Sequence, residues 1–231
     1  MRSFCGTHHP FDVDRPEFRR HVGRISAIRA RIYDPPMDGE DAMPTSARSD
    51  DRLTYDDFLR FPDDGKRHEI IDGVHYVTPS PNRRHQQLSA RIHLSLAEHL
   101  RAHPSQGEVY YAPFDVIFSR WDIVEPDLLL VASDQLEILT DKNVVGAPAL
   151  VVEIPSPGTR RRDVHLKRRL FERSGVREYW LVDPSRSVVS VFRRTDTGAF
   201  TPAAELHASE RATLTTSILP GWSLAIDRLF T

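Results

Sequence analysis

The chain has 231 residues, 39% of them hydrophobic and 28% charged, a composition typical of one globular domain with an extension. Its 31 basic and 33 acidic residues give a net charge of -2, so bulk charge does not indicate a nucleic-acid binder, although DNA binding depends on where positive charge lies. The single cysteine, Cys5, excludes an internal disulfide framework and fits a cytoplasmic setting. No apolar run approaches the roughly 20 residues that span a membrane, so we expect no membrane partner.

The first fifty residues differ from the rest of the chain. They carry scattered arginines and no sustained hydrophobic period, and they hold five prolines: Pro10, Pro16, Pro35, Pro36 and Pro44. Such a segment has little to bury in a core. We therefore interpret residues 1–50 as a poorly ordered N-terminal extension or linker, and residues 51–231 as the folded domain.

Regular structure is predicted from Thr54, which resembles the N-cap of a short helix because acidic residues follow it in the first turn. The runs 68–71 and 74–77 flank Asp72-Gly73, a strong signal for a β-hairpin. Residues 82–103 show a helical period with an apolar face. That face is expected to carry Leu88, Ile92, Leu96 and Leu100.

The second half of the sequence alternates strands with one helix and then becomes β-rich from 200 to 229. The predicted strands are 109–118, 123–131, 149–154, 179–182 and 188–192, and the predicted helix is 163–174, ended by Gly175. Apolar strands bounded by helices favour a sheet covered on both faces. We therefore predict an α/β protein of the α+β kind, with helices on both faces of a mixed β-sheet.

Asp127 is the first residue with a chemical signal. It leads directly into the apolar strand Leu128–Val131, and a carboxylate in such a place is costly unless it is paired or binds a metal. The structural alternative is an aspartate that caps the turn after Pro126.

Glu153 ends the most apolar strand of the chain, where open α/β sheets place their sites. By itself Glu153 could equally be a solvated strand end. Two carboxylates at the ends of adjacent strands, however, are hard oxygen ligands that suit Mg²⁺ or Mn²⁺. Asp127 and Glu153 are therefore candidate metal ligands.

Lys167 is expected on the apolar side of the helix 163–174, because Val164, Leu170 and Phe171 lie three or four residues away. It could be a lysine whose stem covers apolar surface while its amine reaches water. Close to the two acids, its charge could instead orient a water molecule or stabilise charge on a phosphate.

Several stretches together resemble the Uma-two (Uma2) family of endonucleases in the PD-(D/E)xK superfamily. The resemblance runs from about Thr54 to Phe230, so it covers nearly all of the chain beyond the extension. The stretches are His68–Gly73, Pro79–Pro81 with His85, Pro126-Asp127, Glu153–Pro157, Arg160–Asp163 with Lys167, and Gly175–Pro184.

This resemblance implies a restriction-endonuclease-like core and a set of roles. Asp127 and Glu153 would bind the metal, with the Ile154 carbonyl as a third ligand. Lys167 would be the superfamily lysine, moved from the usual position, here Pro155, to the following helix. Glu69 would be an accessory acid in the catalytic set.

The implied substrate is DNA, hydrolysed with Mg²⁺ or Mn²⁺. His85 is a candidate substrate contact. Phosphate contacts are expected from Arg160, Arg161 and Arg162, which could alternatively form a solvated charged face.

Three functions remain open from the sequence. The first is a metal-dependent DNA endonuclease, favoured by the set Asp127, Glu153 and Lys167. The second is a catalytically weak nuclease fold that binds nucleic acid or a protein partner, and the third is a hydrolase of another phosphate ester. A homodimer is expected by analogy, because related folds pair to cut two strands.

Overall fold

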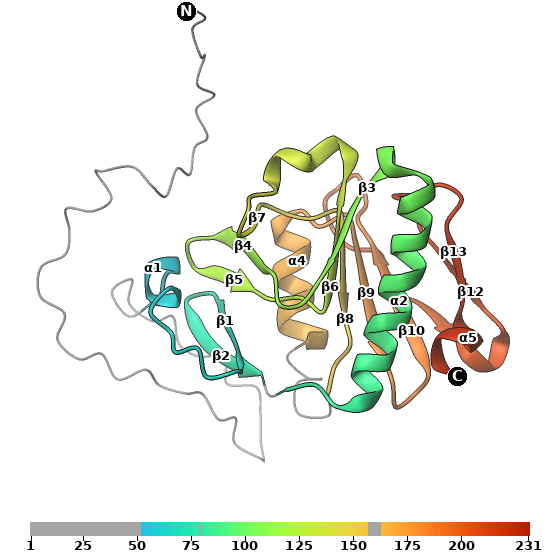
Figure 1. The fold of residues 1–231 in the computed structure, drawn as a ribbon, viewed down its shortest axis with the longest axis horizontal. Helices are drawn as coiled ribbons and strands as arrows, with labels where there is room; N and C mark the ends of the chain where they lie inside the picture. The colour runs from blue at the N-terminus through green and yellow to red at the C-terminus, as the bar shows by residue number, and fades with distance from the viewer. Residues whose placement is uncertain (1–51, 79, 157–162) are drawn as a thin grey trace, which may run out of the picture. The chain divides into compact units, whose positions relative to one another are not determined.

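The computed structural model describes residues 52–78, 80–156 and 163–231. The predicted extension, residues 1–50, lies outside these residues. The described part contains a six-stranded sheet in the order β11-β10-β9-β8-β6-β3, a five-stranded sheet in the order β2-β1-β5-β4-β7, and the pair β12-β13 (Figure 1). The fold is thus α+β with mixed sheets, as predicted, although the strands divide among three sheets where one was expected.

The elements occur in the following order. They are α1 (Tyr55–Phe58), β1 (Arg67–Ile71), β2 (Val74–Thr78), α2 (Arg83–Ala102), η3 (Pro104–Gln106), β3 (Gly107–Tyr111), β4 (Asp115–Ser119), β5 (Asp122–Val124), β6 (Leu128–Ala132), η4 (Ser133–Ile138), β7 (Asn143–Val145), β8 (Leu150–Glu153), η5 (Asp163–Lys167), α4 (Arg168–Ser174), β9 (Glu178–Asp183), β10 (Val188–Arg193), β11 (Ala204–His207), η6 (Ala208–Glu210), β12 (Thr213–Thr215), β13 (Ser223–Ala225) and α5 (Ile226–Phe230).

The hairpin β1–β2 forms around the turn predicted from the sequence. Asp72 and Gly73 both have positive φ, of 54° and 77°. This is the backbone that a two-residue hairpin turn requires and that Asp-Gly adopts at low cost. The turn fixes the register in which Glu69 faces Tyr76 across the hairpin.

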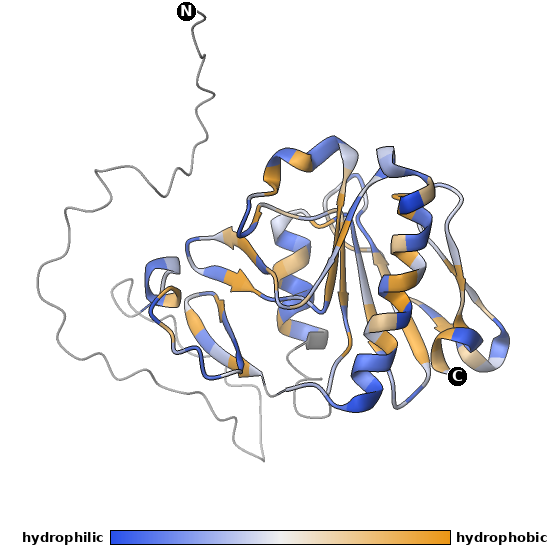
Figure 2. Ribbon diagram, viewed as in Figure 1, coloured by the Kyte–Doolittle hydropathy of each residue, from blue (hydrophilic) through white to orange (hydrophobic). Residues whose placement is uncertain are grey.

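One face of the six-stranded sheet packs against α2. The predicted apolar face of this helix is buried with Leu128 and Leu130 of β6, and α5 lies in the same core cluster. Asn82 caps the helix, accepting a hydrogen bond from the backbone N–H of His85 at 2.9 Å. Figure 2 shows α2 with both hydrophilic and hydrophobic residues, as expected of a helix with one buried face.

The other face of the sheet packs against α4 and the five-stranded sheet. Leu129 and Val131 of β6 cluster there with Leu170 and Phe171 of α4. Helices therefore cover both faces of the large sheet, as predicted, and the second sheet adds to one of these layers. The helix predicted at 163–174 begins as the π-helical turn η5 before α4, and it ends at Gly175 with a φ of 98°.

Two predicted strands were wrong in extent, and a proline explains each case. Residues 109–118 form β3 and β4 on either side of Pro113, and residues 123–131 form β5 and β6 on either side of Pro126. Proline has no N–H to donate to a strand ladder. The two halves of each run then enter different sheets, so β5 and β6 bring the two sheets together at Glu125–Asp127.

Candidate active site

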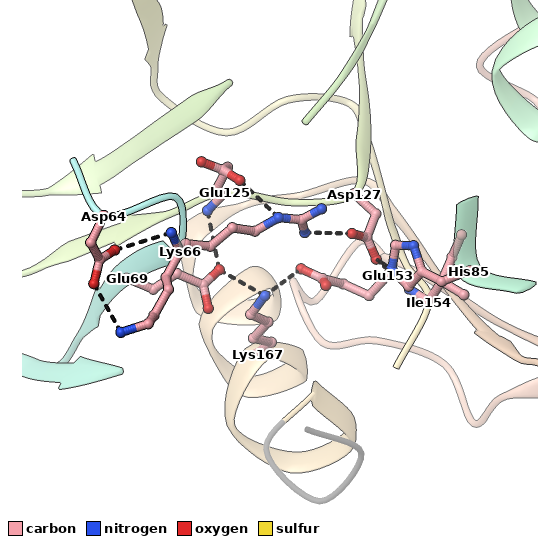
Figure 3. A network of polar contacts seen from close by, with 10 residues as sticks. Asp64, Lys66, Glu69, His85, Glu125, Asp127, Glu153, Ile154 and Lys167 are labelled. Atoms are coloured by element: carbon pink, nitrogen blue, oxygen red, sulfur yellow. Dashed lines mark hydrogen bonds and ion pairs between the residues drawn. The ribbon is translucent and has the colours of Figure 1, made fainter. Parts of the chain in front are cut away.

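A buried lysine bridges two buried acids from different sheets. Lys167, the last residue of η5, is 3% exposed, and its Nζ lies 2.8 Å from Oε1 of Glu153 and 2.8 Å from Oε1 of Glu69. Glu153 ends β8 and Glu69 lies in β1. Figure 3 shows the lysine amine between the two carboxylates. Two anions at this distance favour the charged ammonium form, so the lysine's burial is compensated.

Asp127 lies beside this bridge because of the strand register. Leu128 of β6 is opposite Val152 of β8 in an antiparallel pair, and continuing this register by one residue beyond β6 places Asp127 opposite Glu153. Residues opposite one another project from the same side of a sheet. The two acids predicted as a pair are thus neighbours, and the alternative of a solvated strand end does not hold for Glu153, which is 3% exposed.

Both oxygens of Asp127 accept hydrogen bonds. Oδ2 accepts from the backbone N–H of Ile154 at 2.8 Å and from Nε2 of His85 at 3.0 Å, while Oδ1 accepts from Nη1 of Arg67 at 2.5 Å. Burial raises the pKa of Asp127, but the hydrogen bonds and charges of His85 and Arg67 outweigh it and leave the pKa below its usual range. Asp127 is therefore held as an anion.

Arg67 and Glu125 belong to this network and were missed from the sequence. Nε of Arg67 lies 2.9 Å from Oε1 of Glu125, and the backbone N–H of Glu125 donates to Oε1 of Glu69 at 3.1 Å. A signal for Arg67 was available, since Arg67 and Glu69 are two apart on β1 and so share one strand face. Its contacts with Glu125 and Asp127 had no signal in the sequence, because these acids are distant from Arg67 along the chain.

Carboxylates outnumber fixed cations in this part of the structure. Burial, together with the charges of neighbouring acids, raises the pKa of Glu125 to about 7 although Arg67 acts in the opposite direction. Burial and the charge of Glu69 raise the pKa of Asp115, at the start of β4, to about 6. This network contains two fixed cations among the described residues, Arg67 and Lys167. The acids around them in the described residues are Glu69, Asp115, Glu125, Asp127 and Glu153.

This sequence and geometry can be compared with known proteins. The family model Uma2, described as "Putative restriction endonuclease", matches residues 55–227. The chain belongs to the Uma2 family. It matches none of the curated proteins.

A solved structure agrees with this assignment at the level of the fold. It is a crystal structure of a "putative nuclease belonging to DUF820" from Anabaena variabilis, with a TM-score of 0.66 and 19% sequence identity. The similarity covers 77% of this chain and 97% of that chain. The core is therefore nuclease-like in fold, as the resemblance implied.

His85, predicted as a substrate contact of this Uma2 protein, bonds to Asp127. A carboxylate can only accept, so Nε2 carries the hydrogen and donates it. Its other ring nitrogen, Nδ1, is buried without a hydrogen-bond partner in the part of the chain that the structure describes. The predicted phosphate contacts Arg160, Arg161 and Arg162 lie outside the described residues.

Metal binding was predicted at Asp127, Glu153 and the Ile154 carbonyl. Within residues 52–78, 80–156 and 163–231, no group of three or more His, Cys, Asp or Glu side chains could hold a metal ion as it stands. Arg67 donates a hydrogen bond to Oδ1 of Asp127, and Lys167 donates one to Oε1 of Glu153. The donor chemistry nevertheless fits a divalent cation, because carboxylates and a backbone carbonyl are hard oxygen ligands.

The described residues also bear on membrane association. None of their helices combines the length and the apolar character needed to cross a bilayer.

Proposed function

We propose that this Uma2 protein is a metal-dependent endonuclease that hydrolyses DNA phosphodiester bonds. The observation that carries the proposal is the bridge of Lys167 between buried Glu69 and Glu153, with Asp127 opposite Glu153. Burying ionised groups costs desolvation energy, and such clusters are frequent at functional sites. An acid pair beside an amine can supply metal ligands and a positive charge for phosphodiester hydrolysis.

Each residue has a part in the proposed reaction. Asp127, Glu153 and the Ile154 carbonyl would hold Mg²⁺ or Mn²⁺, which when bound polarises the scissile phosphate and activates water for attack. Lys167 supplies a fixed positive charge where negative charge grows on the phosphate oxygens. Glu69 holds the Lys167 amine from the side opposite Glu153, and His85 holds Asp127, so both are positioned before the substrate arrives.

The decisive test is nicking of supercoiled plasmid by the full chain with Mg²⁺ or Mn²⁺. Asp127→Asn keeps the shape of the side chain, removes its charge, and should reduce nicking at least ~100-fold, the order of effect of removing one catalytic group. Asp134→Asn is the matched control, because Asp134 pairs with Arg177 on an exposed surface. Equal nicking by Asp127→Asn and wild type would refute the proposed site.

One observation favours the alternative of a catalytically weak module that binds nucleic acid or a protein. The hydrogen bonds from Arg67, His85 and Ile154 leave Asp127 engaged on both oxygens. Plasmid binding without nicking at any metal concentration would support this alternative. Metal-dependent hydrolysis of a small phosphodiester without DNA cleavage would support a different phosphate ester as substrate.

The proposal extends to assembly and location. A homodimer would bring two centres to the two strands of a duplex, and light scattering of the full chain tests it. The single cysteine fits a reducing environment, so we place the enzyme in the cytoplasm.

A further inference from the structure

The two oxygens of Asp127 differ in how firmly they are engaged. Oδ2 accepts from a backbone N–H, that of Ile154 next to β8, and from His85 of α2, which is packed in the core. Oδ1 is contacted by the side chain of Arg67. A cation that binds Asp127 and leaves the backbone bond intact must therefore approach Oδ1, where the guanidinium lies.

The guanidinium of Arg67 is placed so that it can move away from Asp127. Its side chain is 20% exposed, whereas those of Asp127 and Lys167 are 3% and 4% exposed. Its Nε contacts Glu125 and its Nη1 contacts Asp127, so the planar group has two separate bonds to two acids. Nη1 can release Asp127 while Nε keeps Glu125, because the guanidinium has five N–H donors.

Lys167 provides the contrast. Its single nitrogen is bound by Glu69 and Glu153 and is almost fully buried, and its backbone leads into α4. Its departure would break two buried ion pairs at once. Of these two described cations, Arg67 is thus the exchangeable one and Lys167 the fixed one.

We propose that Arg67 is a resident substitute for the metal ion: its guanidinium fills the cation position on Oδ1 of Asp127, and a divalent ion displaces it toward Glu125 and solvent. The inference rests on the proposed function. Arg67 keeps the acids neutralised when no metal is present and competes with the metal for Asp127. The same charge also repels an incoming cation, so both effects lower the affinity for metal.

The test is a titration of the full chain with Mn²⁺, followed by the electron paramagnetic resonance signal of free Mn²⁺. Arg67→Met keeps the bulk of the side chain and should lower the dissociation constant at least about 10-fold, the effect of removing one close charge at the protein surface. Arg173→Met is the matched control, because Arg173 pairs with Asp72 and Asp122 at another surface. Its dissociation constant should equal that of wild type.

A second measurement does not depend on a variant that folds. In the wild-type chain, the nuclear magnetic resonance signals of the Arg67 side chain should change on saturation with Mg²⁺, while those of Arg173 stay unchanged. An Arg67 signal that is unaffected by bound metal would overturn the inference. So would Arg67→Met with unchanged or weaker affinity for Mn²⁺.

The outcomes separate the inference from the proposed function. If wild type binds Mn²⁺, Asp127→Asn abolishes the binding and Arg67→Met has no effect, the metal site stands and the role of Arg67 falls. If neither wild type nor Arg67→Met binds Mn²⁺, the metal-dependent function falls and the inference with it. Tighter binding by Arg67→Met that is lost in Arg67→Met/Asp127→Asn supports both.

Discussion

Two buried acids lie at opposite ends of the parallel strands β8 and β9. Glu178 begins β9 opposite Leu150, and Glu153 ends β8 opposite Leu181. The two residues are equally buried, at 2% and 3% exposed. Among the described residues their surroundings differ in the ratio of donors to acids, and we expect this ratio to separate a carboxylate that serves the fold from one placed for chemistry.

Glu178 is one acid with several donors. Its Oε1 accepts from Nε1 of Trp180 at 2.6 Å and from Arg193 at 3.4 Å, and its Oε2 accepts from the hydroxyl of Thr216 at 3.0 Å. Burial raises the pKa of Glu178, and these donors act in the opposite direction. Two of the three donors are neutral, so the group is satisfied by hydrogen bonding that would serve a neutral carbonyl equally well.

At the Glu153 end, each of two described cations is shared by two acids. Lys167 bonds to both Glu69 and Glu153, and Arg67 bonds to both Glu125 and Asp127. This is also the carboxyl end of β8, where sites of open α/β sheets are found. Burial alone therefore does not distinguish the two ends, and we expect the functional site where buried acids share one cation.

The largest effect that tests this comparison is expected from Lys167→Met. The change breaks the ion pairs of Lys167 with Glu69 and Glu153 and should lower the free energy of unfolding by about 3–5 kcal/mol, the usual cost of breaking a buried ion pair. Urea denaturation in the presence of a chelator measures it, with the exposed Lys142→Met as control. A loss below about 1 kcal/mol would mean that the bridge is not an effective ion pair.

Much of this fold could be predicted because its signals are local. Asp-Gly specified the hairpin turn, and the four-residue period of α2 identified the face that is buried. Helical spacing also placed Lys167 on the apolar side of its helix, although the turn that carries it is π-helical, but the spacing left open whether the amine is buried. These features depend on neighbours a few residues away, where chain geometry leaves few options.

What could not be predicted depends on contacts between distant residues. Arg67 and Asp127 are 60 positions apart, and their contact exists because β1 and β6 belong to sheets that meet at Glu125–Asp127. That division was itself missed, since Pro126 was placed inside one predicted strand, 123–131, and was not interpreted as a break between two. Asp127, Glu153, Glu69 and Lys167 were placed near one another by a family resemblance, and their catalytic roles remain predictions.

Asp115→Asn should have the next largest effect, with the opposite sign. The pKa of Asp115 is raised to about 6 in the folded chain, so the folded state binds a proton more strongly than the unfolded state, in which this pKa is near its ordinary value of 3.8. Stability is therefore lost as the pH rises from about 4 to 6 and stays lower above it. Removing the charge should increase the free energy of unfolding at pH 8 by about 3 kcal/mol.

The pH dependence provides the check on this prediction. The difference between Asp115→Asn and wild type should vanish near pH 4 and reach its full value above pH 7, measured by urea denaturation with a chelator present. The exposed Asp141→Asn should match wild type throughout. If Asp115→Asn raised the free energy of unfolding equally at every pH, the cause would be packing and not repulsion between Asp115 and Glu69.

Glu178→Gln should have the smallest effect, because its surroundings do not need the charge. The amide oxygen can still accept from the Trp180 indole, and the amide nitrogen can donate to the Thr216 hydroxyl, so the main hydrogen bonds survive. What is lost is the ion pair with Arg193, which is 43% exposed and worth no more than about 1 kcal/mol. Relief of the buried charge offsets part of that loss. Urea denaturation should therefore show a change in the free energy of unfolding below about 1 kcal/mol. Arg193→Met, which removes the same ion pair, should give a change of similar size. A loss as large as that of Lys167→Met would show that the charge interactions at the two ends of these strands contribute equally to stability, and the distinction by donor ratio would fail.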